Sequence, residues 1–268
     1  MSVTIHPTAI VSDGAKIGDG SSIGAYSIIG PRVVLGKGNK IGPHVVIEGN
    51  TVIGDENTIF QFASVGAEPQ DLKYKGEDSL LEIGSHNKIR EFVTLQPGTS
   101  GGGMLTKIGD SNLFMANCHV GHDAIIANNN VFANSAAIAG HVTIGSGVTL
   151  GGLSGVHQFV KLGDFCLLGA GSMITKDIPP FCIAQGDRAH LFGINKVALS
   201  RKGYSSDDVL KIRKIYREIF FDEGNLTSKA EAAKTKYAGF ELGQQFIEFI
   251  SQSERGVTLP IKSDADSE

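Results

Sequence analysis

The chain of 268 residues contains no tryptophan, and its three cysteines are odd in number. Because Cys118, Cys166 and Cys182 include no CxxC pair, neither a disulfide framework nor a cysteine zinc site is expected. No stretch approaches about 18 consecutive apolar residues, and the N-terminal MSVTIHPTAI lacks the features of a secretory signal. These absences predict a reduced, cytoplasmic protein without stable membrane insertion.

The chain also lacks an excess of positive charge. It has 24 Lys and Arg residues against 28 Asp and Glu residues, a formal net charge of -4. A general nucleic-acid binder would show a basic field, so that class is excluded. Glycine, at 35 residues, has about double its usual ~7% share. Aliphatic residues are nevertheless plentiful, so the chain can form one large domain, or a large and a small one.

What is present is a period of six residues. From Ile5 to Val65, from Ile83 to Leu95 and from Ile108 to Ile174, nearly every sixth residue is aliphatic or Phe, usually followed by Gly or Ala. Six is neither a helical period nor that of an ordinary strand. It is typical of a hexapeptide solenoid, in which three hexads form a triangular coil of about 18 residues. The aliphatic side chains point inward, and the small positions that include Cys118 and Cys166 pack beside them.

The period does not fix the handedness of the coil. Parallel crossovers are normally right-handed. The hexapeptide pattern, however, resembles that of the left-handed parallel β-helices, and the resemblance implies an all-β solenoid of this hand.

Two segments interrupt the hexads and read as projecting loops, residues 66–79 and 97–107. We therefore predict a β-helix over residues 1–186 that carries both loops, and a small α-helical C-terminal domain over residues 187–268. A helix is expected from Ser205, which is a plausible N-cap, and two further helices near 227–238 and 241–253. Residues 262–268 are expected to fray. The first helix presents one apolar stripe: Val209, Ile212, Ile215, Tyr216, Ile219 and Phe220.

The stretch NCHVGHDAIIANNN, residues 117–130, contains histidines and an aspartate that a repeat does not need. Residues 18 apart share a corner of successive coils and are separated by about 4.8 Å. His122 therefore stacks under Gly140 and then Gln158, and Asp123 stacks under His141. His157 lies above Gly121 and Ala139 in the neighbouring row. We expect these side chains to converge on one outward corner.

This constellation suits acyl transfer without a protein nucleophile. His122 can act as general base for a hydroxyl, with Asp123 fixing its tautomer, and the backbone N–H of Gly140 can face a developing oxyanion. No G-x-S-x-G motif and no cysteine stands in this column, so an acyl-enzyme is not expected. Outward apolar residues nearby indicate burial by a neighbouring subunit of a symmetric oligomer: Leu153, Phe159 and Phe165.

Several motifs together carry a family resemblance: FQFASVGAEPQDLKYKGE, HVGHD, IAGHV, VHQF, IPPFCIAQGDRA, FGIN and LSRKGYS. In this order they resemble the UDP-N-acetylglucosamine 3-O-acyltransferases, which catalyse the first step of lipid A synthesis. The likeness covers nearly the whole chain. It implies a homotrimer with active sites between subunits, UDP-N-acetylglucosamine as acceptor and a 3-hydroxyacyl thioester on acyl carrier protein as donor, with neither cofactor nor metal.

The resemblance also assigns roles. His122 matches the catalytic base, Asp123 its orienting partner and Gly140 the oxyanion backbone. The other matches fall into three groups. Gln70, Asp71 and Lys73 match a substrate-contacting loop, and His141, His157 and Gln158 match residues that line the sugar and acyl site, to which we add His119. Asn195, Arg201 and Lys202 match nucleotide and phosphate contacts, and Leu167 and Ala170 match the region that sets acyl length.

Two departures from the family pattern stand in the nucleotide region. Lys202 replaces an expected second arginine, which weakens bidentate phosphate recognition. Val197 stands where an acidic contact is expected. Three other functions remain open from the residues alone: a zinc-dependent carbonic anhydrase using His119, His122 and His141, the N-acyltransferase acting later in the same pathway, and a non-catalytic scaffold.

Overall fold

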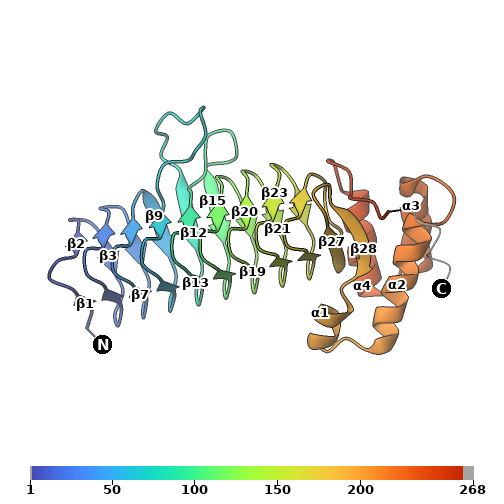
Figure 1. Ribbon diagram of the computed structural model, residues 1–268, viewed down its shortest axis with the longest axis horizontal. Helices are drawn as coiled ribbons and strands as arrows, with labels where there is room; N and C mark the ends of the chain where they lie inside the picture. The colour runs from blue at the N-terminus through green and yellow to red at the C-terminus, as the bar shows by residue number, and fades with distance from the viewer. Residues whose placement is uncertain (1, 262–268) are drawn as a thin grey trace.

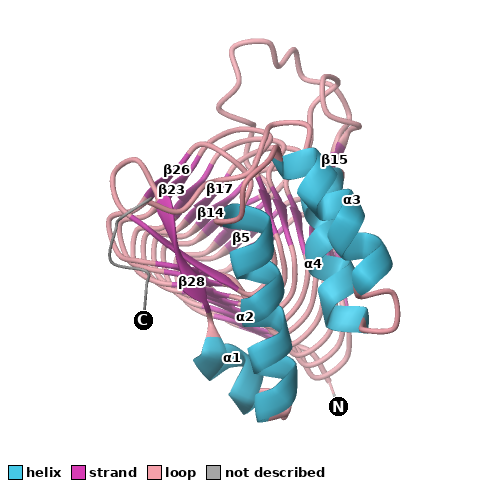
Figure 2. Ribbon diagram, turned by 90° about the vertical axis from the view of Figure 1, so that its right-hand side faces the viewer, coloured by secondary structure: helices cyan, strands magenta, loops and turns pink. Residues whose placement is uncertain are grey.

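The structure is a computed structural model that describes residues 2–261, so the predicted fraying of residues 262–268 lies outside the described residues. A long triangular solenoid runs from the N-terminus, and four helices stand at its far end (Figure 1). Viewed along the solenoid, these helices lie in front of the stacked coils (Figure 2). In residues 2–261, no helix is both long and apolar enough to cross a membrane.

Three sheets form the walls of the solenoid, and their strands are parallel except for the last pair of the first sheet. The first sheet consists, in order, of β1 (Thr4–Ile5), β4 (Ser22–Ile23), β7 (Lys40–Ile41), β10 (Thr58–Ile59), β13 (Lys88–Ile89), β16 (Leu113–Phe114), β19 (Val131–Phe132), β22 (Thr149–Leu150), β25 (Leu167–Leu168), β27 (Cys182–Gln185) and β28 (His190–Ile194).

The other two sheets are shorter. The second consists of β2 (Ile10–Val11), β5 (Ile28–Ile29), β8 (Val46–Ile47), β11 (Ser64–Val65), β14 (Thr94–Leu95), β17 (His119–Val120), β20 (Ala137–Ile138), β23 (Gly155–Val156) and β26 (Met173–Ile174). The third consists of β3 (Lys16–Ile17), β6 (Val34–Leu35), β9 (Asn50–Ile53), β12 (Leu80–Ile83), β15 (Leu105–Ile108), β18 (Ile125–Ile126), β21 (Thr143–Ile144) and β24 (Lys161–Leu162).

The register follows the predicted coil length wherever no loop intervenes. Thr4 pairs with Ser22, 18 residues further on. Most of the hexad aliphatics are buried in the centre of the triangle, where Phe114 stacks on Phe132 at 4.5 Å between ring centroids. Burial of this continuous apolar column stabilises the fold at about 25 cal/mol per Å² of apolar surface removed from water. Cys118 lies in this core, and burial raises the pKa of its thiol to about 11.

The two interrupted coils carry the predicted loops, which project from the same side of the solenoid (Figure 1). The prediction was wrong for residues 105–107, because Leu105 to Lys107 pair with Leu80 to Glu82 and belong to β15. Glu77 joins the loops: its carboxylate accepts the N–H of Ser100 at 3.0 Å and that of Lys75 at 2.7 Å. These two hydrogen bonds, Ser100 first, lower the pKa of Glu77 to about 2.

Beyond the hexads, β27 turns back into β28 as an antiparallel pair, and the helices follow. The helices are α1 (Lys196–Arg201), α2 (Ser206–Phe220), α3 (Leu226–Lys236) and α4 (Glu241–Ser251). The three predicted helices are confirmed to within two residues, and Ser205 caps α2 in a capping box with Asp208. The hairpin and α1 were not predicted. The predicted boundary at residue 186 lies in the turn between β27 and β28, and the division into two domains stays a prediction.

Candidate active site

The predicted column of polar residues exists. The N–H of His141 donates to the carbonyl of His122 at 2.9 Å, and the N–H of Phe159 donates to the carbonyl of Gly140 at 3.3 Å. Asp123, His141 and Phe159 occupy the same corner of three successive coils, each with φ near +60°. Coil stacking therefore brings the predicted residues to one place.

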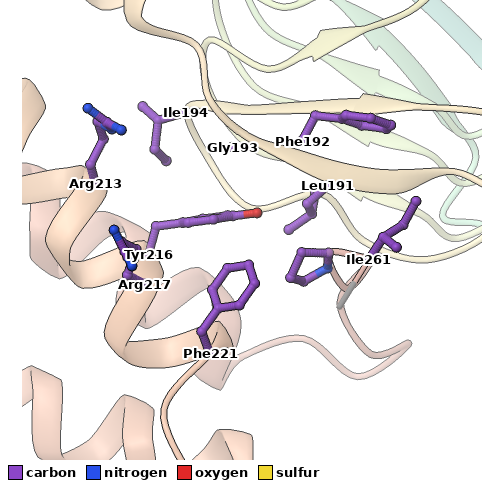
Figure 3. Close-up of a pocket in the computed structure, with 10 residues that line it drawn as sticks. Leu191, Phe192, Gly193, Ile194, Arg213, Tyr216, Arg217, Phe221 and Ile261 are labelled. Atoms are coloured by element: carbon purple, nitrogen blue, oxygen red, sulfur yellow. The ribbon is translucent and has the colours of Figure 1, made fainter. Parts of the chain in front are cut away.

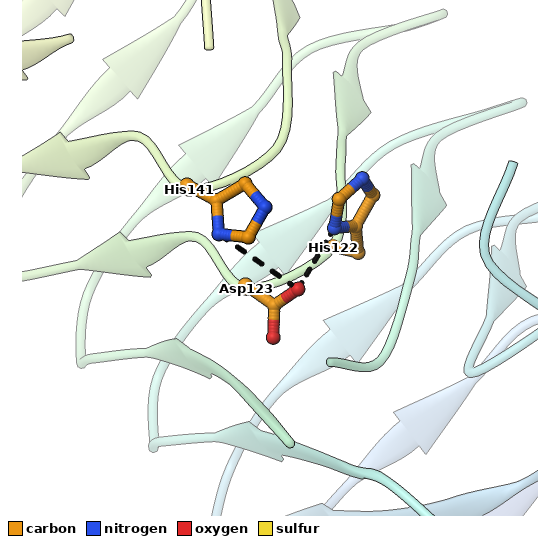
Figure 4. Close-up of side chains that lie close together, drawn as sticks. All are labelled: His122, Asp123 and His141. Atoms are coloured by element: carbon orange, nitrogen blue, oxygen red, sulfur yellow. Dashed lines mark hydrogen bonds and ion pairs between the residues drawn. The ribbon is translucent and has the colours of Figure 1, made fainter. Parts of the chain in front are cut away.

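His122 and Asp123 form a buried pair directly after β17. The Nδ1 atom of His122 lies 2.8 Å from Oδ2 of Asp123 (Figure 4). The two residues are only 7% and 5% exposed. Because a carboxylate accepts hydrogen bonds, this contact places the proton of the neutral imidazole on Nδ1 and leaves Nε2 as the free base.

Asp123 is held from three directions. Its Oδ1 accepts the backbone N–H of Thr99 at 2.9 Å, and its Oδ2 accepts the hydroxyl of Thr99 at 2.6 Å. The N–H of Asp123 itself donates to the hydroxyl of Thr106 at 2.7 Å. Gly102 lies so close that an added Cβ would be 2.0 Å from Cγ of Asp123. The loop from residue 97 thus covers the carboxylate and orients it.

His141 completes the cluster without bonding to the carboxylate. Its Nδ1 lies 4.0 Å from Oδ2 of Asp123, while its ring meets that of His122 edge-on and stacks on Phe159 at 4.4 Å between centroids (Figure 4). Burial lowers the pKa of His141 and outweighs the opposing pull of Asp123. In the described chain, His122, Asp123 and His141 can approach one metal ion, with ligand atoms within 4.8 Å of one another.

His119 belongs to the same wall but has a different partner. Its Nδ1 lies 2.7 Å from the hydroxyl of Thr94 on the preceding coil. Burial, and secondarily the charge of His122, lowers the pKa of His119. Within one chain the three-histidine zinc set is therefore not the set that comes together, since Asp123 replaces His119 in it.

Gly140 stands against the face of His122. An added Cβ would lie 2.6 Å from both Cε1 and Nε2 of His122, closer than side chains approach one another. The backbone N–H of Gly140 donates to no protein acceptor among residues 2–261. A bare peptide N–H beside the free Nε2 of a histidine suits stabilisation of an oxyanion.

A cavity of about 470 Å³ opens at this corner. It brings together the predicted residues Gln70, His119, His122, Gly140, His157 and Gln158. The remaining lining is mostly apolar or small: Gln96, Gly121, Ala137, Ile138, Ala139, Gly155, Val156, Met173, Ile174 and Thr175. A polar end and an apolar trough suit a ligand with a polar head and a hydrocarbon chain.

The other predicted residues do not line this cavity. Asp71 and Lys73 lie on the projecting loop, close enough to influence the pKa of His141. Asn195 caps α1, where its amide donates to the carbonyl of Phe165 at 2.9 Å and its Oδ1 accepts from Ala198. Arg201 ends that helix, and the ammonium of Lys202 lies 5.5 Å from the Phe165 ring centroid. The half-buried Leu167 lies in β25, and the exposed Ala170 follows it.

A second cavity, of about 370 Å³, lies between β28, α2 and the C-terminal segment. Figure 3 shows Arg213 and Arg217 on one side of it, with Phe192 and Phe221 around the remainder. None of the residues at the His122 corner lines this second cavity.

Residues missed by sequence reasoning lie mainly across an interrupted coil. Thr94 pairs with His119 at a separation of 25 residues because the loop lengthens that coil. Thr99 and Asp123 are likewise 24 residues apart. The loop was recognised, so counting its additional residues could have found Thr94; nothing in the sequence pattern pointed to Thr99.

A hexapeptide solenoid whose outward corner holds a His–Asp pair beside a free peptide N–H defines a hexapeptide-repeat acyltransferase. Comparisons with known proteins specify the family. Residues 177–258 match the family model described as Udp N-acetylglucosamine O-acyltransferase, domain 2. An acyl-[acyl-carrier-protein]–UDP-N-acetylglucosamine O-acyltransferase of Myxococcus xanthus is 48% identical and covers 95% of this chain and 98% of its own length. The Sulfurovum protein of the same name is 45% identical, over 97% and 99%.

Solved structures agree. LpxA from Acinetobacter baumannii matches with a TM-score of 0.93 and 45% identity, covering 95% of this chain and 99% of that one. The Arabidopsis UDP-N-acetylglucosamine acyltransferase matches with a TM-score of 0.82 and 32% identity, over 96% and 100%. The chain belongs to the UDP-N-acetylglucosamine O-acyltransferase family. It is an acyltransferase with a left-handed β-helix and a small helical C-terminal part.

Proposed function

We propose that the protein transfers an (R)-3-hydroxyacyl group from acyl carrier protein to the 3-hydroxyl of UDP-N-acetylglucosamine, the first step of lipid A biosynthesis. The observation that carries this proposal is the His122–Asp123 pair, 2.8 Å apart, at a cavity whose wall includes the unpaired N–H of Gly140. Relatives with 45–48% identity over nearly the whole chain are named for this donor and acceptor. A cytoplasmic location belongs to the same proposal.

The chemistry follows from the geometry. Nε2 of His122 takes the proton of the sugar hydroxyl while its oxygen attacks the thioester carbonyl, and Asp123 stabilises the imidazolium through Nδ1. The carbonyl oxygen becomes an oxyanion that the N–H of Gly140 stabilises. When the intermediate collapses, the C–S bond breaks and His122 returns the proton to the leaving thiolate. No acyl-enzyme forms, since no cysteine or activated serine lines the cavity.

A homotrimer accounts for the predicted residues that lie away from the cavity. Asn195, Arg201 and Lys202 are on or beside α1, which does not reach the His122 cavity of its own chain. We assign them to the nucleotide and its phosphates at a site shared with a neighbouring chain. Leu153, 68% exposed, and Phe159, 55% exposed, are apolar surfaces that such a neighbour would cover.

Within the same proposal, His119, His141, His157 and Gln158 contact the sugar or the acyl group, and Gln70, Asp71 and Lys73 close over the acceptor. Ala170 and Leu167 set the acyl length. A close approach of coils supports the last assignment: a Cβ on Gly151 would lie 2.5 Å from the backbone nitrogen of Ala170. The exposed methyl of Ala170 therefore stands where a methylene group changes the room for a chain.

Mass spectrometry tests the proposal directly. Wild type and His122→Ala are incubated with UDP-N-acetylglucosamine and a series of 3-hydroxyacyl carrier proteins of increasing length. We expect one preferred length, and a loss of at least about 100-fold in the variant, because a general base contributes about that much or more. Sedimentation checks the oligomer. His86→Ala is the matched control, since His86 occupies an equivalent corner of another coil with φ of 61°.

Other outcomes would favour the alternatives. Acylation only of a 3-amino sugar nucleotide indicates the N-acyltransferase, and bound zinc with hydration of carbon dioxide indicates the anhydrase. No product at any length in wild type removes the proposed function, and turnover by His122→Ala at the wild-type rate removes the general-base role.

A further inference from the structure

The C-terminal segment after α4 returns to the solenoid and is fastened beside the active-site cavity. The hydroxyl of Ser253 donates to Oδ2 of Asp177 at 2.7 Å, and the N–H of Asp177 donates to the carbonyl of Gly256 at 3.0 Å. The N–H of Thr258 donates to the carbonyl of Asp177 at 2.8 Å. Because Asp177 is only 1% exposed, these bonds are shielded and fix the position of the segment.

Arg255 lies in the middle of this fastened segment and reaches the cavity wall. Its Nε donates to the carbonyl of Thr175 at 2.6 Å, and its Nη2 lies 2.9 Å from Nδ1 of His157. Thr175 and His157 both line the cavity that contains His122. The planar guanidinium thus spans two residues of the wall, which a flexible ammonium cannot do with the same geometry.

This contact determines the tautomer of His157. A guanidinium only donates hydrogen bonds, so Nδ1 must be the acceptor and the proton of the neutral ring must be on Nε2. A competing contact exists: Nδ1 also lies 3.2 Å from the carbonyl of Gln158, which would require a proton on Nδ1. That proton would point at the cationic Arg255. The shorter, charge-assisted bond therefore prevails.

We propose that Arg255 is a positioning residue that holds His157 with its Nε2–H free to donate to a substrate oxygen in the cavity. The proposal rests on the proposed function, because the bound substrate supplies the acceptor. It connects the helical part of the chain, by way of residues 253–258, to the chemistry on the solenoid.

Steady-state kinetics of four variants test this role: Arg255→Ala, Arg255→Lys, His157→Ala and the double variant. The kcat/KM of Arg255→Ala should fall about tenfold, the lower range for a hydrogen bond to a charged group, because Arg255 and His157 are partly solvated. Arg255→Lys should lose less, since it keeps one cationic donor. In the His157→Ala background, removal of Arg255 should cost nothing further.

Ser253→Ala is the matched control, because it removes a bond that anchors the same segment but does not touch His157. It should lower thermal stability and leave kcat/KM unchanged. A second readout does not depend on turnover: spectra of isotope-labelled histidine ring nitrogens, with the His157 signal assigned from the His157→Ala variant. Wild type should show Nε2 protonated, and Arg255→Ala a mixture of tautomers.

Each contrary result overturns the proposal in a distinct way. Unchanged kcat/KM in Arg255→Ala shows that the contact has no effect on the reaction. Equal losses in Arg255→Ala and Ser253→Ala show that Arg255 only anchors the segment, and an undiminished loss in the His157→Ala background shows that it acts without His157. An inactive wild type would refute the proposed function instead, and the histidine spectra would still decide whether Arg255 sets the tautomer.

Discussion

One added methyl group at Gly140 should disable the base without removing any catalytic atom. The Cβ of Gly140→Ala would lie 2.6 Å from Cε1 and Nε2 of His122 and 3.0 Å from Nδ1. Non-bonded heavy atoms are at optimal separation at about 3.5–4.0 Å, so the imidazole must retreat by roughly 1 Å. His122 is buried and bonded to Asp123 at 2.8 Å, so the ring cannot retreat and keep that bond.

The magnitude of this effect follows from the displacement. A misplacement of about 1 Å costs on the order of 100-fold in rate, and complete loss of the base costs about 100- to 10,000-fold. We therefore expect kcat/KM of Gly140→Ala to fall by about 100-fold or more. Overpacking of this kind also costs about 1–3 kcal/mol of stability. The backbone N–H is retained, so the loss reports on the base and not on the oxyanion donor.

The assay is acyl transfer from the preferred acyl carrier protein donor, together with thermal unfolding. Gly239→Ala is the control, because an added Cβ there meets nothing within 4 Å. The reasoning is refuted if folded Gly140→Ala turns over within a few-fold of wild type. It is also refuted if a structure of the variant shows the His122–Asp123 bond unchanged while activity is lost.

Three further perturbations test other parts of the site. Thr99→Val removes the 2.6 Å hydroxyl bond to Asp123, so denaturant titration should show about 1.5–3 kcal/mol lost and kinetics a lower kcat. Lys73→Ala should mainly raise the KM for the sugar nucleotide, measured against an unchanged KM for the donor. Burial lowers the pKa of His119 and His141, so both favour the neutral form when folded. Their contribution to stability is complete above the ordinary pKa of 6.5 and is lost as pH falls below it, so the melting temperature should fall in acid, and less steeply in His119→Gln.

The repeat predicted the parts of the site that depend on coil stacking alone. His122, Gly140 and His141 meet because uninterrupted coils contain 18 residues, which a period of six specifies. The orienting contacts of Asp123 were not predictable in this way. They come from Thr99, on a loop whose path is determined by its own hydrogen bonds and not by the period.

The C-terminal part divides along the same line. The apolar stripe of α2 and its cap at Ser205 specify that helix locally, and the structure confirms it. The hairpin of β27 and β28 has no clear alternation and a register shift at Ile183, so its pairing depends on tertiary contact. Arg255 likewise has no local signal. Its meeting with His157, 98 residues earlier, exists only after the segment has docked on Asp177.

The backbone of the site is not itself special, which limits what strain can explain. Asp123 and His141 have positive φ, a conformation that non-glycine residues rarely adopt and that often marks a functional position. Tyr26, His44 and Phe62, however, have the same φ at a corner far from the cavity. The left-handed corner is therefore a property of every coil, imposed by the solenoid. What distinguishes the active corner is the set of side chains placed on it, together with the glycine that leaves room for the imidazole. A transplanted His–Asp pair on another coil should accordingly fold but remain inactive unless a glycine follows 18 residues later.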